Sequence, residues 1–237
     1  MSATDRVILR RGTFDRGIWT NIANDYPSTP ERFEPADVVV DVGCHIGAFC
    51  HLAAERGAGT VLGFEPNREN YALAQVNLAG RPSVTVHNAA IWRSDVEPEP
   101  LRFIPGPYAE NTGEGSVLFA DAPWEPQLEQ LSEHEVAAVP LDEALTPYQR
   151  IRLLKLDAEG AEFPILLTSR ALDRVDAVVG EYHEFTAQQM AELPERAVVG
   201  DRTYDWPLLE ELLAAAGFST VRQEVVAGRG LFAAARA

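Results

Sequence analysis

Apolar and polar positions along this chain alternate between two periods, one typical of buried strands and one typical of helices. Strand-like apolar runs occupy residues 38–42, 60–67, 83–91, 150–160, 176–185, 219–226 and 230–235. Helical spacing of apolar residues occurs in 46–53, 67–78, 162–167 and 207–216. Strands that alternate with helices build parallel sheets, whereas the last two strands follow each other directly as a hairpin. The pattern predicts one α/β domain over residues 1–237, with helices on both faces of a seven-stranded, mostly parallel sheet and an antiparallel C-terminal hairpin.

The stretch VVVDVGCHIGAF, residues 38–49, is a strand that turns over glycine into a helix. Such a turn lets a ligand approach the backbone, and the helix N-terminus offers unpaired N–H groups to a nucleotide. The dinucleotide pattern G-x-G-x-x-G is absent, because Asp41 precedes Gly43 and Gly47 is the next glycine. An acidic residue at this strand end suits the cationic amino group of S-adenosylmethionine (SAM). The alternative is an ordinary strand-to-helix turn of a doubly wound fold.

Polar residues also follow the next two strands. Glu65 ends the second strand, where a carboxylate accepts hydrogen bonds from both ribose hydroxyls of a bound nucleotide. Asn67 is placed to cap the following helix. Asn88 and Ala89 end the third strand, where we expect an adenine ring, although Asn88 also suits a turn.

Two segments lie outside this alternation. Residues 12–37 predict a short amphipathic helix before the first strand, which either covers the ligand or only covers the sheet. Residues 93–135 are rich in proline and acidic residues, and they are too long for a plain connection, so we predict a lid or hairpin excursion. Four aromatic residues in these segments are candidates for an apolar acceptor wall: Trp19, Tyr26, Tyr108 and Trp124.

Composition narrows the class of protein. Hydrophobic residues make up 46% and charged residues 24% of the 237 residues, as in ordinary globular proteins. The net charge of -16 argues against a nucleic-acid partner, because a phosphate backbone would be repelled. The sequence contains no apolar segment long enough to predict a secretion signal or a membrane span. Cys44 and Cys50 are poorly placed to form a disulfide bond with each other. We therefore expect a reduced, cytoplasmic protein without a membrane partner, and the sequence leaves open whether it forms a homo-oligomer.

Five segments occur in an order that resembles one enzyme family: DVGCHIG, GFEPNREN, HNAAI, LLKLDAEGAE and VVGEYHEF. Together with GTFDRGIW and the Tyr26 that follows it, they are similar to the FkbM family of SAM-dependent methyltransferases. The similarity covers most of residues 12–185. It implies a class I fold, SAM as the methyl donor, S-adenosylhomocysteine (SAH) as a product, and usually O-methylation of a sugar or natural-product hydroxyl.

The resemblance also implies roles for individual residues. The methionine cradle would consist of Asp41, Gly43, Cys44, His45 and Gly47. Glu65 with Pro66 would hold ribose, Asn88 with Ala89 would face adenine, and Asp157 would stand beside the reactive methyl. His45 departs from the general pattern, since many methyltransferases have a second glycine there.

A hydroxyl acceptor needs a base, because a neutral alcohol is a poor nucleophile. His183 is the first candidate, since imidazole titrates near neutral pH, and Asp157 is the second. The alternative for His183 is a structural hydrogen bond to Glu181. A divalent metal held by Asp157, Glu159, Glu181 and His183 is possible but not favoured, and zinc at the Cys–His pairs 44–45 and 50–51 is less so.

Three rival functions remain open from the sequence. An amine acceptor would also suit an acidic site. A nicotinamide-dependent oxidoreductase shares the strand, turn and acidic residue, although the third glycine of its fingerprint is missing. A protein that binds SAM without catalysis is the third.

Overall fold

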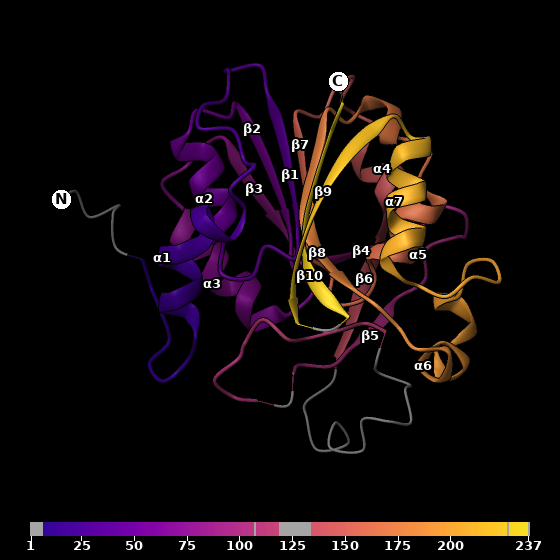
Figure 1. The fold of residues 1–237 in the computed structure, drawn as a ribbon. Coiled ribbons are helices and arrows are strands. Elements are labelled where there is room, and N and C mark those ends of the chain that lie inside the picture. The colour runs from indigo at the N-terminus through magenta and orange to yellow at the C-terminus, as the bar shows by residue number, and fades with distance from the viewer. Residues whose placement is uncertain (1–6, 107, 119–133, 227, 237) are drawn as a thin grey trace.

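The computed structural model describes residues 7–106, 108–118, 134–226 and 228–236. Its main sheet has seven strands in the order β3-β2-β1-β7-β8-β10-β9 (Figure 1). The strands are β1 (Val38–Val42), β2 (Thr60–Phe64), β3 (Val84–His87), β7 (Leu153–Leu156), β8 (Ala177–His183), β9 (Phe218–Val226) and β10 (Arg229–Arg236). Neighbouring strands from β3 to β8 pair in parallel, and β10 runs antiparallel to both β8 and β9. This is the predicted seven-stranded, mostly parallel sheet with its antiparallel C-terminal hairpin.

Helices cover both faces of the sheet, as predicted (Figure 1). One face carries α1 (Asp15–Asp25), α2 (Ala48–Glu55) and α3 (Arg68–Leu78), and the other carries α4 (Leu141–Leu145), α5 (Glu162–Thr168) and α7 (Trp206–Ala215). The short helix α6 (Ala187–Glu192) and the 3-10 turns Leu172–Arg174 and Glu195–Ala197 complete the set. Asn67 caps α3 by accepting hydrogen bonds from the backbone N–H groups of Glu69 and Asn70. All five residues of β1 are buried, which explains why four of them are valine.

The predicted third strand, residues 83–91, is wrong as a single strand. The chain forms β3 in the main sheet and then β4 (Ala89–Trp92) in a second sheet of three strands, ordered β4-β6-β5. Asn88 lies at the break, where its side-chain amide donates to the carbonyl oxygens of Glu65 (2.8 Å) and Pro66 (3.1 Å). This amide fastens the turn to the end of β2, so the apolar residues after it are buried in a different sheet.

The excursion over residues 93–135 contributes to this second sheet. Its strand β5 (Leu101–Phe103) pairs antiparallel with β6 (His134–Pro140), and β6 pairs in parallel with β4. Between them, Ile104 bridges to Ser116, and the carbonyl oxygen of Glu110 accepts a hydrogen bond from the N–H of Phe14. Residues 108–118 are therefore fastened to the start of α1. Trp124 lies outside the described residues, and a lid role for the excursion stays a prediction.

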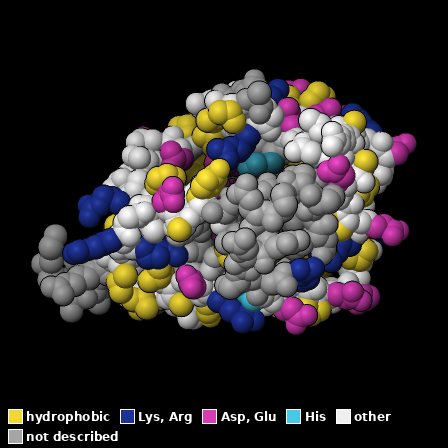
Figure 2. All heavy atoms as spheres, turned by 90° about the horizontal axis from the view of Figure 1, so that it is seen from below, with side chains coloured by type: hydrophobic (Ala, Val, Ile, Leu, Met, Phe, Trp, Pro, Cys, Tyr) yellow, Lys and Arg dark blue, Asp and Glu magenta, His cyan; other side chains and the backbone are white. Residues whose placement is uncertain are grey.

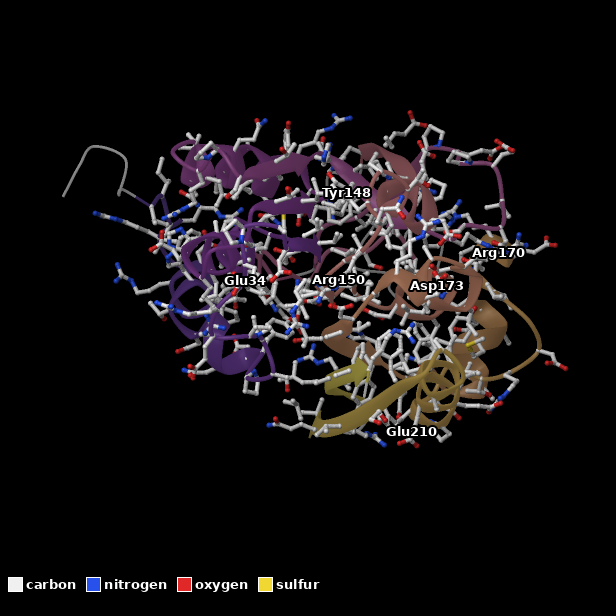
Figure 3. The ribbon with its side chains drawn as sticks, turned by 90° about the horizontal axis from the view of Figure 1, so that it is seen from above. Glu34, Tyr148, Arg150, Arg170, Asp173 and Glu210 are labelled. Atoms are coloured by element: carbon white, nitrogen blue, oxygen red, sulfur yellow. The ribbon has the colours of Figure 1, made fainter. Side chains whose placement is uncertain are left out.

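The two ends of the main sheet differ in their side chains. At the end where the parallel strands begin, the labelled residues Glu34, Arg150 and Asp173 are exposed polar side chains (Figure 3). At the opposite end, basic and histidine side chains meet at a hollow in the surface (Figure 2). The predicted site residues follow the strands at this carboxyl end, which therefore holds the candidate site.

Candidate functional site

A cavity of about 360 Å³ opens at the carboxyl ends of β1, β2, β7 and β8. Its walls come from these strand ends, from α1, from β4 and from the 111–117 part of the excursion. The predicted site residues that line it are Gly43, Cys44, His45, Glu65, Pro66, Ala89 and Asp157. Those outside its lining are Asp41, Gly47, Asn88 and His183. Of the four candidate aromatic residues, Tyr26 lines the cavity, whereas Trp19 packs on the ring of His51.

The turn after β1 needs glycine at two places for different reasons. Gly43 has a φ of +74°, and a Cβ there would collide with the carbonyl oxygen of Asp157 at the cavity wall. Gly47 has a φ of +91° and precedes α2, where a Cβ would lie 2.6 Å from the side chain of Leu78. Gly43 thus lets the turn after β1 approach the Asp157 backbone closely, and Gly47 lets α2 pack against α3.

His45 also has a left-handed backbone, with a φ of 51°. This backbone conformation explains why many methyltransferases have a glycine at the position where this chain has His45. Its Nε2 lies 2.8 Å from the Thr112 hydroxyl and 3.3 Å from the Arg10 guanidinium, which pairs with the buried Asp15. Burial is the largest influence on its pKa and lowers it to about 4, so the ring is neutral. Sequence reasoning missed Arg10 and Asp15, because nothing local links them to the cradle.

Glu65 is a buried carboxylate that two backbone N–H groups hold in place. Its Oε2 accepts the backbone N–H of His45 and its Oε1 that of Asn67, both at 2.8 Å. Burial raises its pKa to about 7, although the two N–H donors oppose this shift. The carboxylate lines the cavity in a fixed orientation, and it can accept further hydrogen bonds from a ligand.

Asp41 does not reach the cavity lining. Its side chain is 0% exposed, and the ammonium of Lys155, itself 3% exposed, lies 3.3 Å from its Oδ1. Lys155 also lies 3.3 Å from Asp157 Oδ2 and donates to the carbonyl oxygen of Gly43 at 2.8 Å. Burial raises the pKa of Asp41, and the Lys155 charge opposes that rise. Lys155 lines the cavity at the strand ends, where the sequence predicted the Asp41 carboxylate. The only sequence feature that pointed to Lys155 was its position in the string KLDAEG.

Asp157 lines the cavity beside Lys155 and the helix α1. It accepts a hydrogen bond from the Tyr26 hydroxyl at 3.1 Å, and it pairs with Lys155. Burial alone would raise its pKa, but the nearby charges of Lys155 and His183 lower it below its ordinary value. Asp157 is therefore an ionised, firmly held carboxylate.

His183 lies among three carboxylates. Its Nδ1 is 3.3 Å from Glu162 Oε1, and its Nε2 is 3.5 Å from Glu159 Oε2 and 3.8 Å from Glu181 Oε2. Burial by itself lowers the pKa of this imidazole, but the carboxylates, Glu162 first, raise it to about 10. The ring is therefore protonated at neutral pH, and the cavity is lined by Glu159 and Glu181 in its place.

No cluster of three or more His, Cys, Asp or Glu side chains in the described ranges is arranged to hold a metal ion. Over the same ranges, no helix is long and apolar enough to cross a membrane. Cys44 and Cys50 are both free thiols, and the Cys50 thiol donates to Asp41 at 3.2 Å.

The family model of the methyltransferase FkbM domain matches residues 41–219 of this sequence. The chain belongs to the FkbM methyltransferase family. This membership makes it a SAM-dependent methyltransferase and favours that activity over a nicotinamide-dependent oxidoreductase. The matched range contains every predicted site residue, from Asp41 to His183.

Other comparisons add less. Among curated proteins, none matches this FkbM methyltransferase. It is similar in structure to the precorrin-6y C5,15-methyltransferase of Geobacter metallireducens GS-15, with a TM-score of 0.49, 9% identity, and coverage of 100% of this chain and 97% of that one. It is also similar to a putative S-adenosylmethionine dependent methyltransferase of Listeria monocytogenes, with a TM-score of 0.46, 16% identity, and coverage of 94% and 99%. With TM-scores below 0.5, these two likenesses decide nothing about its substrate.

Proposed function

We propose that this FkbM methyltransferase moves the methyl group of SAM to a hydroxyl of a small molecule, such as a sugar or a natural-product intermediate. The observation that carries the proposal is the single cavity, which joins the Glu65 carboxylate to the carboxylates of Asp157, Glu159 and Glu181. A fixed carboxylate is what ribose recognition needs, and acidic groups stabilise a cationic donor.

The residues present fit the donor. Glu65 is already oriented by two backbone N–H groups, and Gly43 lines the same cavity without a side chain. Pro66 and Ala89 supply apolar surface for a nucleobase near the Glu65 end. Lys155 in the cavity wall suits the carboxylate of an amino acid, and the buried Asp41 keeps that ammonium in place.

When bound, SAM supplies a methyl group already activated by a sulfonium centre. The protein's own task is to align the acceptor, exclude water and receive a proton. The helix α1 and the 111–117 segment close the cavity on one side, with Ile18, Ile22 and Tyr26 in its lining. Tyr26 also fixes the Asp157 carboxylate through its hydroxyl.

An amine acceptor is the second candidate. Asp25, Asp157, Glu159 and Glu181 line the cavity, and they would attract an ammonium group. Arg229, which also lines the cavity, is a cation that favours a neutral or anionic acceptor instead. We place the hydroxyl first because a carboxylate wall with a proton-accepting member suits an alcohol.

Calorimetry with SAM and, separately, NADH tests the donor. We expect SAM to bind and NADH not to bind. Binding of NADH but not of SAM would favour a nicotinamide-dependent oxidoreductase instead. SAH release is then measured with a panel of sugars and phenols against a matched panel of primary amines. Turnover with the amines alone would show that the acceptor is an amine and not a hydroxyl. SAM binding without turnover on either panel would contradict both proposed acceptors.

A further inference from the structure

We propose that Glu181, not His183, is the catalytic base that takes the proton from the acceptor. The inference rests on the proposed function, because it assigns a residue to the acceptor side of the same cavity. It follows from which side chains reach the cavity and which of them are already committed to other partners.

The sheet register brings Glu181 to the cavity. Asp41 on β1, Lys155 on β7 and Val179 on β8 are direct neighbours across three parallel strands. Two residues further along the chain stand Gly43 and Asp157, just past the ends of β1 and β7, and Glu181, which is still on β8 and on the same face as Val179. All three of these residues line the cavity. Glu181 thus lies in the same row as the glycine of the cradle.

His183 cannot serve as the base in this arrangement. Its ring is outside the cavity lining, and both nitrogens face carboxylates, with Glu162 at 3.3 Å and Glu159 at 3.5 Å. An imidazole that is already protonated has no lone pair left to accept a proton. We assign His183 as a positioning residue whose charge holds the Glu181 carboxylate, 3.8 Å away.

The two other cavity carboxylates are less suitable. Asp157 is paired with Lys155 and receives the Tyr26 hydroxyl, so its ionised form is stabilised and it is a weak base. Glu159 has the opposite character: burial and neighbouring carboxylates raise its pKa well above the ordinary value, so it keeps its own proton. Asp157 binds a proton too weakly, and Glu159 is already protonated.

Glu181 has neither handicap. Its side chain is 30% exposed, and no described residue donates a hydrogen bond to its carboxylate, although His183 lies 3.8 Å away. Burial and then the charge of Asp157 raise its pKa, while His183, Arg229 and Lys155 lower it, and the result is about 7. Glu159 also interacts electrostatically with Glu181, and it lines the same cavity. A base with this pKa is suited to act near neutral pH.

The step balances without another reactant. As the acceptor oxygen bonds to the methyl carbon, the carbon–sulfur bond breaks and its electron pair stays on sulfur. The acceptor's O–H proton passes to the Glu181 carboxylate, which then returns it to solvent through its exposed side. The products are the methyl ether and SAH.

Binding tests this placement without the identity of the acceptor. Sinefungin is an analogue of SAM that carries an amine where SAM carries the transferred methyl, so its affinity relative to SAH reports on charge at that point. We expect Glu181→Gln to bind SAH within about threefold of the unsubstituted protein and to lose about tenfold in its affinity for sinefungin. The matched control is Glu192→Gln on α6, which should change neither affinity.

The pH dependence supplies a readout that a structural role would not move. In the unsubstituted protein, the preference for sinefungin over SAH should fall as pH drops through about 7, and Glu181→Gln should abolish this dependence. Ionisation of Glu65 affects both ligands equally and cancels in the ratio. An unchanged ratio in Glu181→Gln, or a ratio independent of pH in the unsubstituted protein, overturns the assignment. Absence of SAH binding to the unsubstituted protein would instead remove the proposed function itself.

Discussion

The two ends of the main sheet treat charged residues in opposite ways. Where the parallel strands begin, Arg150 is 62% exposed and pairs with Asp37 and Asp176, on the surface seen in Figure 3. Where they end, Lys155 is 3% exposed between Asp41 and Asp157. Exposed pairs contribute little to stability, because water screens them, whereas each buried charge must keep its partners.

The difference coincides with the position of the candidate site. Carboxylates with raised pKa values occur at the carboxyl end, namely the buried Glu65 and the partly exposed Glu181, and a ligand there can replace the water that they lost. Arg150 at the amino end needs no ligand, because it is already solvated. The comparison predicts that substitutions at the two ends differ in size and in kind.

The largest effect is expected at Lys155. Lys155→Met should lower the free energy of unfolding by about 3–5 kcal/mol, because it leaves Asp41 and Asp157 as buried carboxylates without their cation. Urea denaturation measures the loss. A loss below about 1 kcal/mol would mean that the two carboxylates are not held by this ammonium, and the contrast between the ends would disappear.

Glu65 should affect ligand binding more than stability. Glu65→Gln replaces one acceptor oxygen by an amide that faces the backbone N–H groups of His45 and Asn67. We expect the affinity for SAH to fall by about tenfold or more, as for other hydrogen bonds to charged groups. Calorimetry checks this, with Glu34→Gln at the amino end (Figure 3) as the matched control. Equal affinities in both variants would contradict a ribose role for Glu65.

The pH dependence of SAH binding sharpens the same point. Because the pKa of Glu65 is raised to about 7, the free protein carries a neutral side chain below that pH, and SAH should bind up to about tenfold more weakly per pH unit between 7 and 5. The sign for folding is the opposite: this raised pKa favours the folded state at low pH, and that contribution is lost as pH rises through 7. Isothermal titration at pH 5, 6, 7 and 8 would show the slope, which Glu65→Gln should flatten.

The smallest effect is expected at Arg150. Arg150→Ala should change the free energy of unfolding by less than about 1 kcal/mol and leave SAH binding unchanged, because its ion pairs are exposed to water. Its unfolding curve belongs beside that of Lys155→Met. A loss of unfolding free energy as large as that of Lys155→Met would show that the amino end of the sheet tolerates the loss of a charged side chain no better than the carboxyl end.

The sequence alone determined much of the fold because its signals are local. Apolar runs over residues 38–40 and 177–179 predict β1 and β8, and Asn67 predicts the start of α3, since capping and burial depend on adjacent residues. The same applies to Gly43 and Glu65, which follow their strands directly. The exception was the strand over residues 83–91, where the Asn88 side chain reaches the carbonyl oxygens at the end of β2.

Only the tertiary structure decided which polar groups face the ligand. Asp41 and Lys155 are far apart in sequence, yet their register across β1 and β7 puts the ammonium in the cavity wall and the carboxylate outside the lining. His183 looked like a base because free imidazole titrates near neutral pH, but carboxylates from α5 and the preceding turn keep it protonated. A strand pattern fixes the face on which a side chain lies, whereas its charge depends on neighbours that only folding brings together.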